Sequence, residues 1–173
     1  EGKLEFEGEY LNGLKWNGKG YDNKGDKIYE IINGDGRIKE KINFSNLKLI
    51  GEYLNGKKTG RATKYDEYDR LIFSGKYIDG IYYGYGKEFY GDGILKYEGE
   101  YLYNQKNGKG KEYNENGKLI YEGEYKDNNR NGKGKEYNEK GKLIFEGEYM
   151  NGKKSGNGKE YNSKGQLIYE GEY

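Results

Sequence analysis

The stretch that decides the fold runs from Tyr121 to Tyr149 and reads YEGEYKDNNRNGKGKEYNEKGKLIFEGEY. It contains two copies of the motif aromatic-x-Gly-Glu-Tyr, which end at Tyr125 and Tyr149, 24 residues apart. The same motif, with Glu or Lys before its last residue, also ends at Tyr77, Tyr101 and Tyr173. A fixed period of this length indicates tandem repeats, in which each unit buries one face against its neighbours.

The composition of the chain is unusual for a folded protein. Charged residues make up 35% and hydrophobic residues 32% of the 173 residues, and the mean hydropathy is −1.29, values that favour disorder. Against this, the chain has no proline and 22 tyrosines, and tyrosine favours strands. A second aromatic residue recurs midway between the motifs, at Tyr65, Phe89, Tyr113, Tyr137 and Tyr161. Two aromatic positions that stay in phase indicate an ordered repeat rather than a disordered tract.

Each repeat reads as two short strands and two tight turns. In the first strand, alternation places Tyr121, Gly123 and Tyr125 on one face of a sheet and Glu122 and Glu124 on the other. Polar turns rich in Asn, Asp and Gly follow each strand, as in antiparallel hairpins. The sequence therefore predicts an all-β protein, an elongated single antiparallel sheet of tandem hairpins of 24 residues, with about fourteen strands from seven units.

Residues 1–173 are predicted to form one repeat array, in which residues 11–50 are degenerate variant repeats. Trp16, the only tryptophan, lies here in what reads as an inserted turn. Residues 27–42 predict a tight hairpin about the sequence Asn-Gly-Asp-Gly. We expect the variant region to form a local bend, and a recognition site is the alternative.

The charges and glycines are expected to serve packing. Glu-Gly-Glu in the first strand and Lys-Gly-Lys in the second would set acids beside bases across the ladder. Gly123 and Gly134 would leave space for tyrosine rings on the other face. The net charge of +1 offers no uniform field for nucleic acid.

Catalytic chemistry finds little support in this sequence. The chain has neither Cys nor His, which excludes disulfides, thiolate chemistry and histidine-based triads. Its 30 acidic residues stand mostly at repeated positions, whereas a catalytic pair would be singular. We therefore predict a protein that is not an enzyme and that needs no cofactor or metal.

The repeat resembles a known family. Tyr121-Glu122-Gly123-Glu124-Tyr125, followed by Asn131-Gly132-Lys133-Gly134, is similar to the membrane occupation and recognition nexus (MORN) repeat. In this sequence Tyr replaces the Trp of the family pattern, and Asn131 stands where His is common. The resemblance implies a β-hairpin array that acts as a docking surface in cytoplasmic assemblies associated with the cytoskeleton or with membranes.

The leading functional hypothesis is a binding or scaffolding module with an exposed aromatic face. That face would dock a protein partner or a second copy of the chain. The residues predicted to contact the partner are Tyr77, Tyr97, Tyr101, Tyr121, Tyr125 and Tyr149. The alternative for each ring is that it only packs on its neighbours.

Peripheral binding to anionic phospholipid is the second hypothesis. Basic residues that recur after the motif could line one edge of the sheet and contact lipid headgroups. They are Lys57, Lys58, Arg130, Lys153 and Lys154. The alternative is that these residues keep the turns soluble.

Overall fold

A computed structural model describes residues 4–22, 24–41, 48–78 and 81–173, with side chains described for all of these except 38–41, 48–50 and 58. Contacts divide the chain into two compact units, Glu1–Tyr82 (unit 1) and Tyr83–Tyr173 (unit 2). All fifteen regular elements of the described residues are β-strands, which confirms the all-β prediction and adds one strand to the expected number.

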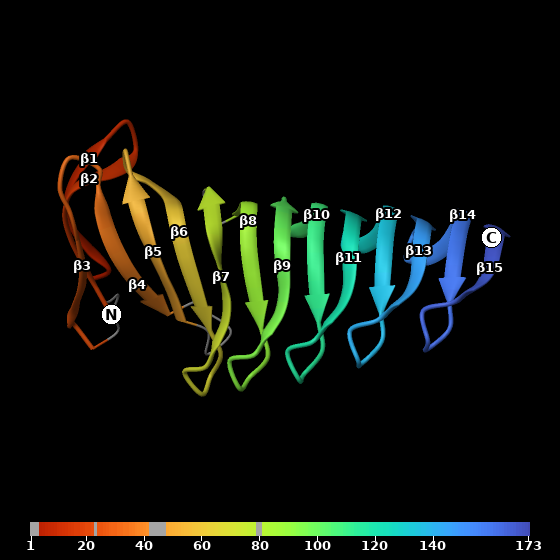
Figure 1. Cartoon of the computed structure of the whole chain (residues 1–173). Coiled ribbons are helices and arrows are strands. Elements are labelled where there is room, and N and C mark those ends of the chain that lie inside the picture. Colours follow the sequence, from red (N-terminus) through yellow and green to blue (C-terminus); the bar gives the residue numbers. More distant parts are fainter. Residues whose placement is uncertain (1–3, 23, 42–47, 79–80) are drawn as a thin grey trace. The chain divides into compact units, whose positions relative to one another are not determined.

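Unit 2 is a meander of antiparallel strands. Figure 1 shows β9 to β15 side by side in chain order, from green to blue. The strands are β8 (Ile81–Phe89), which spans the boundary between the units, β9 (Leu95–Leu102), β10 (Gln105–Tyr113), β11 (Leu119–Lys126), β12 (Asn129–Tyr137), β13 (Leu143–Met150), β14 (Lys153–Tyr161) and β15 (Leu167–Glu172). Each strand pairs with the next one along the chain, which confirms the tandem hairpins.

Two kinds of turn alternate along unit 2. The turn within a repeat has two central residues with positive φ, as at Asn151 (50°) and Gly152 (81°), a conformation whose twist suits a two-residue hairpin. The turn between repeats is held by an asparagine side chain. The Oδ1 of Asn138 accepts hydrogen bonds from the backbone N–H groups of Lys140 (2.9 Å) and Lys142 (3.1 Å).

Unit 1 contains seven whole strands in two groups. The first group, β1 (Phe6–Leu11), β2 (Leu14–Tyr21) and β3 (Lys27–Ile31), forms a three-stranded sheet. The second group, β4 (Gly36–Lys41), β5 (Lys48–Leu54), β6 (Lys57–Tyr65) and β7 (Leu71–Ile78), is antiparallel. The first three strands thus form a sheet of their own, so the expectation of a single continuous sheet fails in this unit.

The variant region explains the interruption. The predicted hairpin keeps its turn, with positive φ at Asn33 and Gly34 and a bridge between Ile32 and Asp35, but β3 and β4 then belong to different sheets. Trp16 lies in strand β2, and its carbonyl accepts a hydrogen bond from the N–H of Gly34 (2.8 Å). The turn at Gly34 is therefore hydrogen-bonded to strand β2, while β3 and β4 separate into different sheets. The prediction of a regular hairpin and that of a turn at Trp16 were wrong.

The core of unit 2 is a line of aromatic rings on one side of its strands. Tyr121 meets Tyr125 and Tyr149 edge to face, with ring centroids 5.4 Å apart in both pairs. Gly134 provides the space for this ring, because a Cβ atom there would lie 2.6 Å from Cε2 and Cζ of Tyr121. The expected role of the strand glycines is thereby confirmed.

Candidate functional site

The six tyrosines predicted to contact a partner are buried. Their relative exposures are 1% for Tyr77, 0% for Tyr97, 5% for Tyr101, 0% for Tyr121, 3% for Tyr125 and 4% for Tyr149. The expectation of an exposed aromatic face at these residues is therefore wrong. Their assignment as partner-contacting residues stays a prediction, and direct contact would require the covering groups to move.

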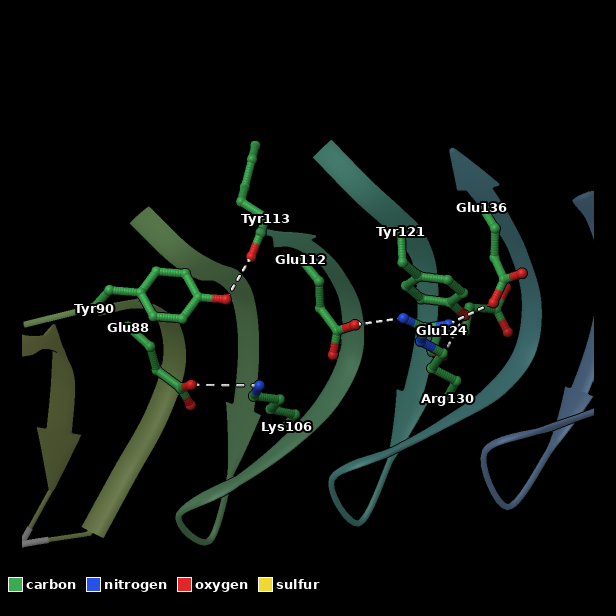
Figure 2. Close-up of polar contacts among 9 residues, drawn as sticks. All are labelled: Glu88, Tyr90, Lys106, Glu112, Tyr113, Tyr121, Glu124, Arg130 and Glu136. Carbon is green, nitrogen blue, oxygen red and sulfur yellow. Dashed lines mark hydrogen bonds and ion pairs between the residues drawn. The ribbon is translucent and has the colours of Figure 1, made fainter. Parts of the chain in front are cut away.

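Cationic side chains cover the rings (Figure 2). The guanidinium of Arg130 lies 4.1 Å from the centroid of the Tyr121 ring. It also pairs with the carboxylates of Glu112 and Glu136, each at 2.6 Å. A cation held in this way stacks on the ring and excludes water from it. The aromatic core is thus closed on its outer side by its own strands.

The same arrangement recurs in the adjacent repeats. Lys106 lies 4.1 Å over Tyr97 and pairs with Glu88 at 3.4 Å, a contact that is also drawn in Figure 2. Lys154 lies 4.2 Å over Phe145 and pairs with Glu160 at 2.6 Å. We call these three cations the ring caps. The sequence analysis missed Lys106 and the glutamates, although their spacing of 24 residues was a usable signal.

The five basic residues predicted to contact lipid differ in their surroundings. Arg130 and Lys154 are ring caps, so their charges are already engaged by glutamates of the sheet. Lys57 and Lys153 are exposed. The side chain of Lys58 lies outside the described residues. The five residues therefore do not form a uniform basic row, and their role at a lipid surface stays a prediction.

An open groove lies on the opposite face of unit 2, with a volume of about 1010 Å³. Its floor is the backbone of glycines that stand opposite one another from strand to strand. They are Gly99, Gly110, Gly123, Gly134, Gly147, Gly158 and Gly171. Because these glycines are in register, the groove runs across the strands rather than along them.

Alternating charges form the walls of the groove. One wall is a ladder in which Glu122 lies opposite Lys111 on one neighbouring strand and Lys135 on the other. The Nζ–Oε2 distance is 3.8 Å for Lys111 and Glu122 and 3.9 Å for Lys135 and Glu146. These pairs confirm the expected placement of acids beside bases. Their charges are partly exposed, so each pair contributes at most about 1 kcal/mol.

The mid-repeat tyrosines fix the orientation of the wall glutamates. The hydroxyl of Tyr137 donates to Glu122 at 2.6 Å, and that of Tyr113 donates to Glu98 at 2.9 Å. Burial and the adjacent Glu122 carboxylate raise the pKa of Tyr137 to about 12. Burial works to raise the pKa of Glu98, but hydrogen bonds from tyrosines and Lys87 outweigh it and lower that pKa. The lowered pKa keeps Glu98 ionised, and the tyrosine hydroxyls hold the carboxylates of Glu98 and Glu122 in place.

Two strands depart from the lysine pattern of the groove, β14 with Asn157 and β8 with Tyr85, and only Tyr85 brings an aromatic ring. At the strand position where β10 and β12 carry Lys109 and Lys133, β8 carries Tyr85. Tyr85 lines the groove, is 51% exposed and stands opposite Glu100. The sequence analysis did not select Tyr85, although its departure from the lysine pattern was visible.

The described residues offer no candidate for a metal site or a membrane-spanning helix. They contain no group of three or more acidic residues placed to hold a metal ion. Nor do they include a helix with the length and apolar character that a membrane crossing needs.

Fold and groove together define a tandem β-hairpin repeat protein with an internal aromatic core and an open polar groove. Within this class, the model of the MORN repeat matches three consecutive segments, residues 97–118, 121–142 and 145–166. This confirms the resemblance drawn from the motif, and it places all three matches in unit 2. A comparison with curated proteins finds no match. MORN repeats are generally non-catalytic and serve as modules for binding or scaffolding.

Proposed function

We propose that the chain is a non-catalytic module that binds an extended segment of a partner protein in the groove of unit 2. The observation that carries this proposal is the continuous glycine floor between two charged walls. A floor without side chains lets another chain approach closely, and the walls supply charges that orient it.

The size of the groove suits an extended peptide. The glycine floor runs from β9 to β15 and crosses six strand spacings of ~4.8 Å, or about 29 Å. At ~3.3 Å per residue, about nine residues of extended chain span that length. A helix has a diameter of about 10–12 Å, whereas the two walls stand on residues two positions apart on each strand, or about 7 Å, so the extended form fits the floor better.

The charge pattern suggests which peptides bind. Along the wall that contains Glu122 and Lys135, charge alternates from one strand to the next, so a like charge recurs about every 9.6 Å. In the polyproline II form of an extended chain, every third side chain lies on the same side, and three residues span about 9.3 Å. A peptide with charges of one sign at every third residue can therefore place each of them beside an opposite charge of the wall.

Other uses of the module have less support from the geometry. Self-association through the aromatic rings would need the ring caps to be displaced, because the rings are buried. Binding to anionic lipid would draw on Arg130 and Lys154, whose charges are engaged within the sheet. Lipid binding is an outcome of the test below, and neither use is proposed separately.

The test compares synthetic nine-residue peptides by fluorescence anisotropy against the full chain. One peptide carries glutamate at every third residue, and a scrambled peptide has the same composition. We expect the spaced peptide to bind more tightly, and we expect the double variant Lys111→Gln, Lys135→Gln to weaken that binding several-fold, because it removes two wall charges. The matched control is Lys126→Gln, Lys153→Gln, which neutralises two exposed lysines outside the groove.

Equal affinities of the spaced and scrambled peptides would contradict the proposal. Equal losses of affinity for the spaced peptide in the two double variants would contradict it as well. Flotation with phosphatidylserine vesicles is run in parallel. Binding to vesicles without binding to any peptide would favour the lipid hypothesis instead.

A further inference from the structure

On β8 the groove carries the aromatic ring of Tyr85, opposite a carboxylate, at the position where β10 and β12 carry a lysine. Lys109 stands opposite Glu124, and Lys133 stands opposite Glu148. Tyr85 stands opposite Glu100 in the same way. The groove-lining residues include seven glutamates and five lysines, a net charge of −2. The replacement of a lysine by Tyr85 contributes to this excess of negative charge.

The chain itself shows what such a combination can bind. Arg130 stacks on the ring of Tyr121 while glutamates on both sides pair with its guanidinium, as Figure 2 shows. Lysines lie in the same way over Tyr97 and Phe145. An aromatic ring with an adjacent carboxylate is thus a recurrent cation site of this sheet. Among the cation–ring contacts of the described residues, none involves Tyr85.

The surroundings of Tyr85 hold its ring in place. Burial and the neighbouring Glu98 carboxylate raise the pKa of Tyr85 to about 12, so its hydroxyl stays protonated and directed at Glu98. Lys87 pairs with that same Glu98 at 3.3 Å, which leaves Glu100 as the carboxylate opposite the ring. With 51% of Tyr85 exposed, a ring face is accessible from the groove.

We infer that Tyr85 and Glu100 form a subsite for an arginine side chain of the partner segment. The guanidinium would stack on the Tyr85 ring and pair with the Glu100 carboxylate, and so fix the register of the segment in the groove. This inference rests on the proposed function and adds to it a residue that the partner must supply.

The test uses nine-residue glycine-serine peptides with one central residue varied between arginine, citrulline and glutamate. Citrulline keeps the shape of arginine but lacks its charge. Binding to the full chain is followed by NMR through the ring signals of Tyr85. We expect the arginine peptide to shift those signals and to bind about ten-fold more tightly than the citrulline peptide.

Variants separate the roles of ring and carboxylate. Tyr85→Lys introduces the residue found at this position in β10 and β12, and it should abolish the preference for arginine over citrulline. Glu100→Gln should reduce that preference, while Tyr85→Phe should keep it. Tyr83→Ala is the matched control, since Tyr83 is a similarly exposed tyrosine of β8 (52%) outside the groove lining. Circular dichroism verifies that each variant is folded.

Two outcomes would overturn the inference in distinguishable ways. Equal binding of the arginine and citrulline peptides, or an unchanged preference in Tyr85→Lys, would remove the subsite but leave the groove as a peptide site. If neither the arginine peptide nor the spaced peptide bound to the chain, both this inference and the proposed function would be overturned.

Discussion

At the scale of single residues, the aromatic core depends on contacts between residues far apart in the sequence. The caps Lys106, Arg130 and Lys154 each combine a ring contact with ion pairs to glutamates. Such a cap shields the ring and pairs with the glutamates beside it. This explains how the tyrosines stay shielded from water in a sheet with so few aliphatic residues.

Removal of one cap should therefore destabilise unit 2. We expect Arg130→Ala to lower the free energy of unfolding by about 1–3 kcal/mol, because it uncovers Tyr121 and leaves Glu112 and Glu136 without their partner. Arg130→Lys should cost less, since lysine is the cap in the adjacent repeats. Urea unfolding measures both. A loss no larger than that of Lys153→Ala, an exposed neighbour of a cap, would contradict the role of the cap.

The glycines of the floor give a second prediction at this scale. Gly134→Ala should destabilise by about 1–3 kcal/mol, because its Cβ atom would overlap the Tyr121 ring and force it to move. Lys133→Ala, on the same strand with an exposed side chain, should change stability by no more than about 0.5 kcal/mol. If the melting temperature fell by a similar amount in the two variants, the ring would not fill the space over Gly134.

High pH should unfold the protein. Burial is the main cause that raises the pKa of Tyr121 and Tyr113 from 10.0 to about 12, and it also raises that of Tyr125. A group with a raised pKa in the folded state gives stability that is complete below pH 10 and is lost between about pH 10 and pH 12. Tyrosinate absorbance and circular dichroism, recorded together, should therefore change in one cooperative step. Ionisation of all tyrosines near pH 10 with the fold retained would refute this.

At the scale of the hairpin, each two-residue turn needs two central residues with positive φ. Asparagine or aspartate takes the first position in most of these turns, as at Asn55, Asp127 and Asn151. Both residue types tolerate this conformation because their short polar side chains bond locally. The turn between β9 and β10 departs from the pattern, since Tyr103 holds the first position with φ of 50°.

Tyr103→Asn should therefore stabilise the protein by about 0.5–1 kcal/mol, because it relieves backbone strain at a side chain that is 71% exposed. Urea unfolding of the variant measures the gain. Tyr83→Asn is the comparison, since it replaces an exposed strand tyrosine and should not stabilise. A loss of stability in Tyr103→Asn would show that the ring makes a contact worth more than the strain.

At the scale of the whole molecule, unit 2 behaves as a one-dimensional array, in which each strand pairs only with its sequence neighbours. Stability should then depend on whole repeats and their interfaces. Deletion of residues 114–137, one period of 24 residues, joins equivalent positions and should leave a folded chain. Deletion of residues 114–125, half a period, should disrupt the strands around the junction, because it removes all of β11 except Lys126 and puts the remaining strands out of phase.

Circular dichroism and thermal unfolding compare the two deletions. We expect the 24-residue deletion to keep the strand signal and to melt cooperatively. Similar spectra and melting temperatures for both deletions would contradict the array model.

Much of the fold could be predicted from the sequence because its causes are local. Alternation in residues 119–125 sets which side chains share a face, and the Asn-Gly turns set the hairpins. The role of Gly134 followed from the same alternation. The variant region was harder to predict, because β3 and β4 separate where backbone hydrogen bonds join Gly34 to Trp16 and Gly56 to Gly34, and these residues lie far apart in the sequence.

The sequence by itself thus determined the period, the strands, the turns and the two chemically distinct faces. Only the tertiary structure decided which face is closed and which is open. The reason is that the closing groups come from other strands: Arg130 on β12 covers Tyr121 on β11 and is held by Glu112 on β10. Alternation within one strand assigns side chains to a face, but the register of three strands decides that the tyrosines are buried and that the glycine floor remains open.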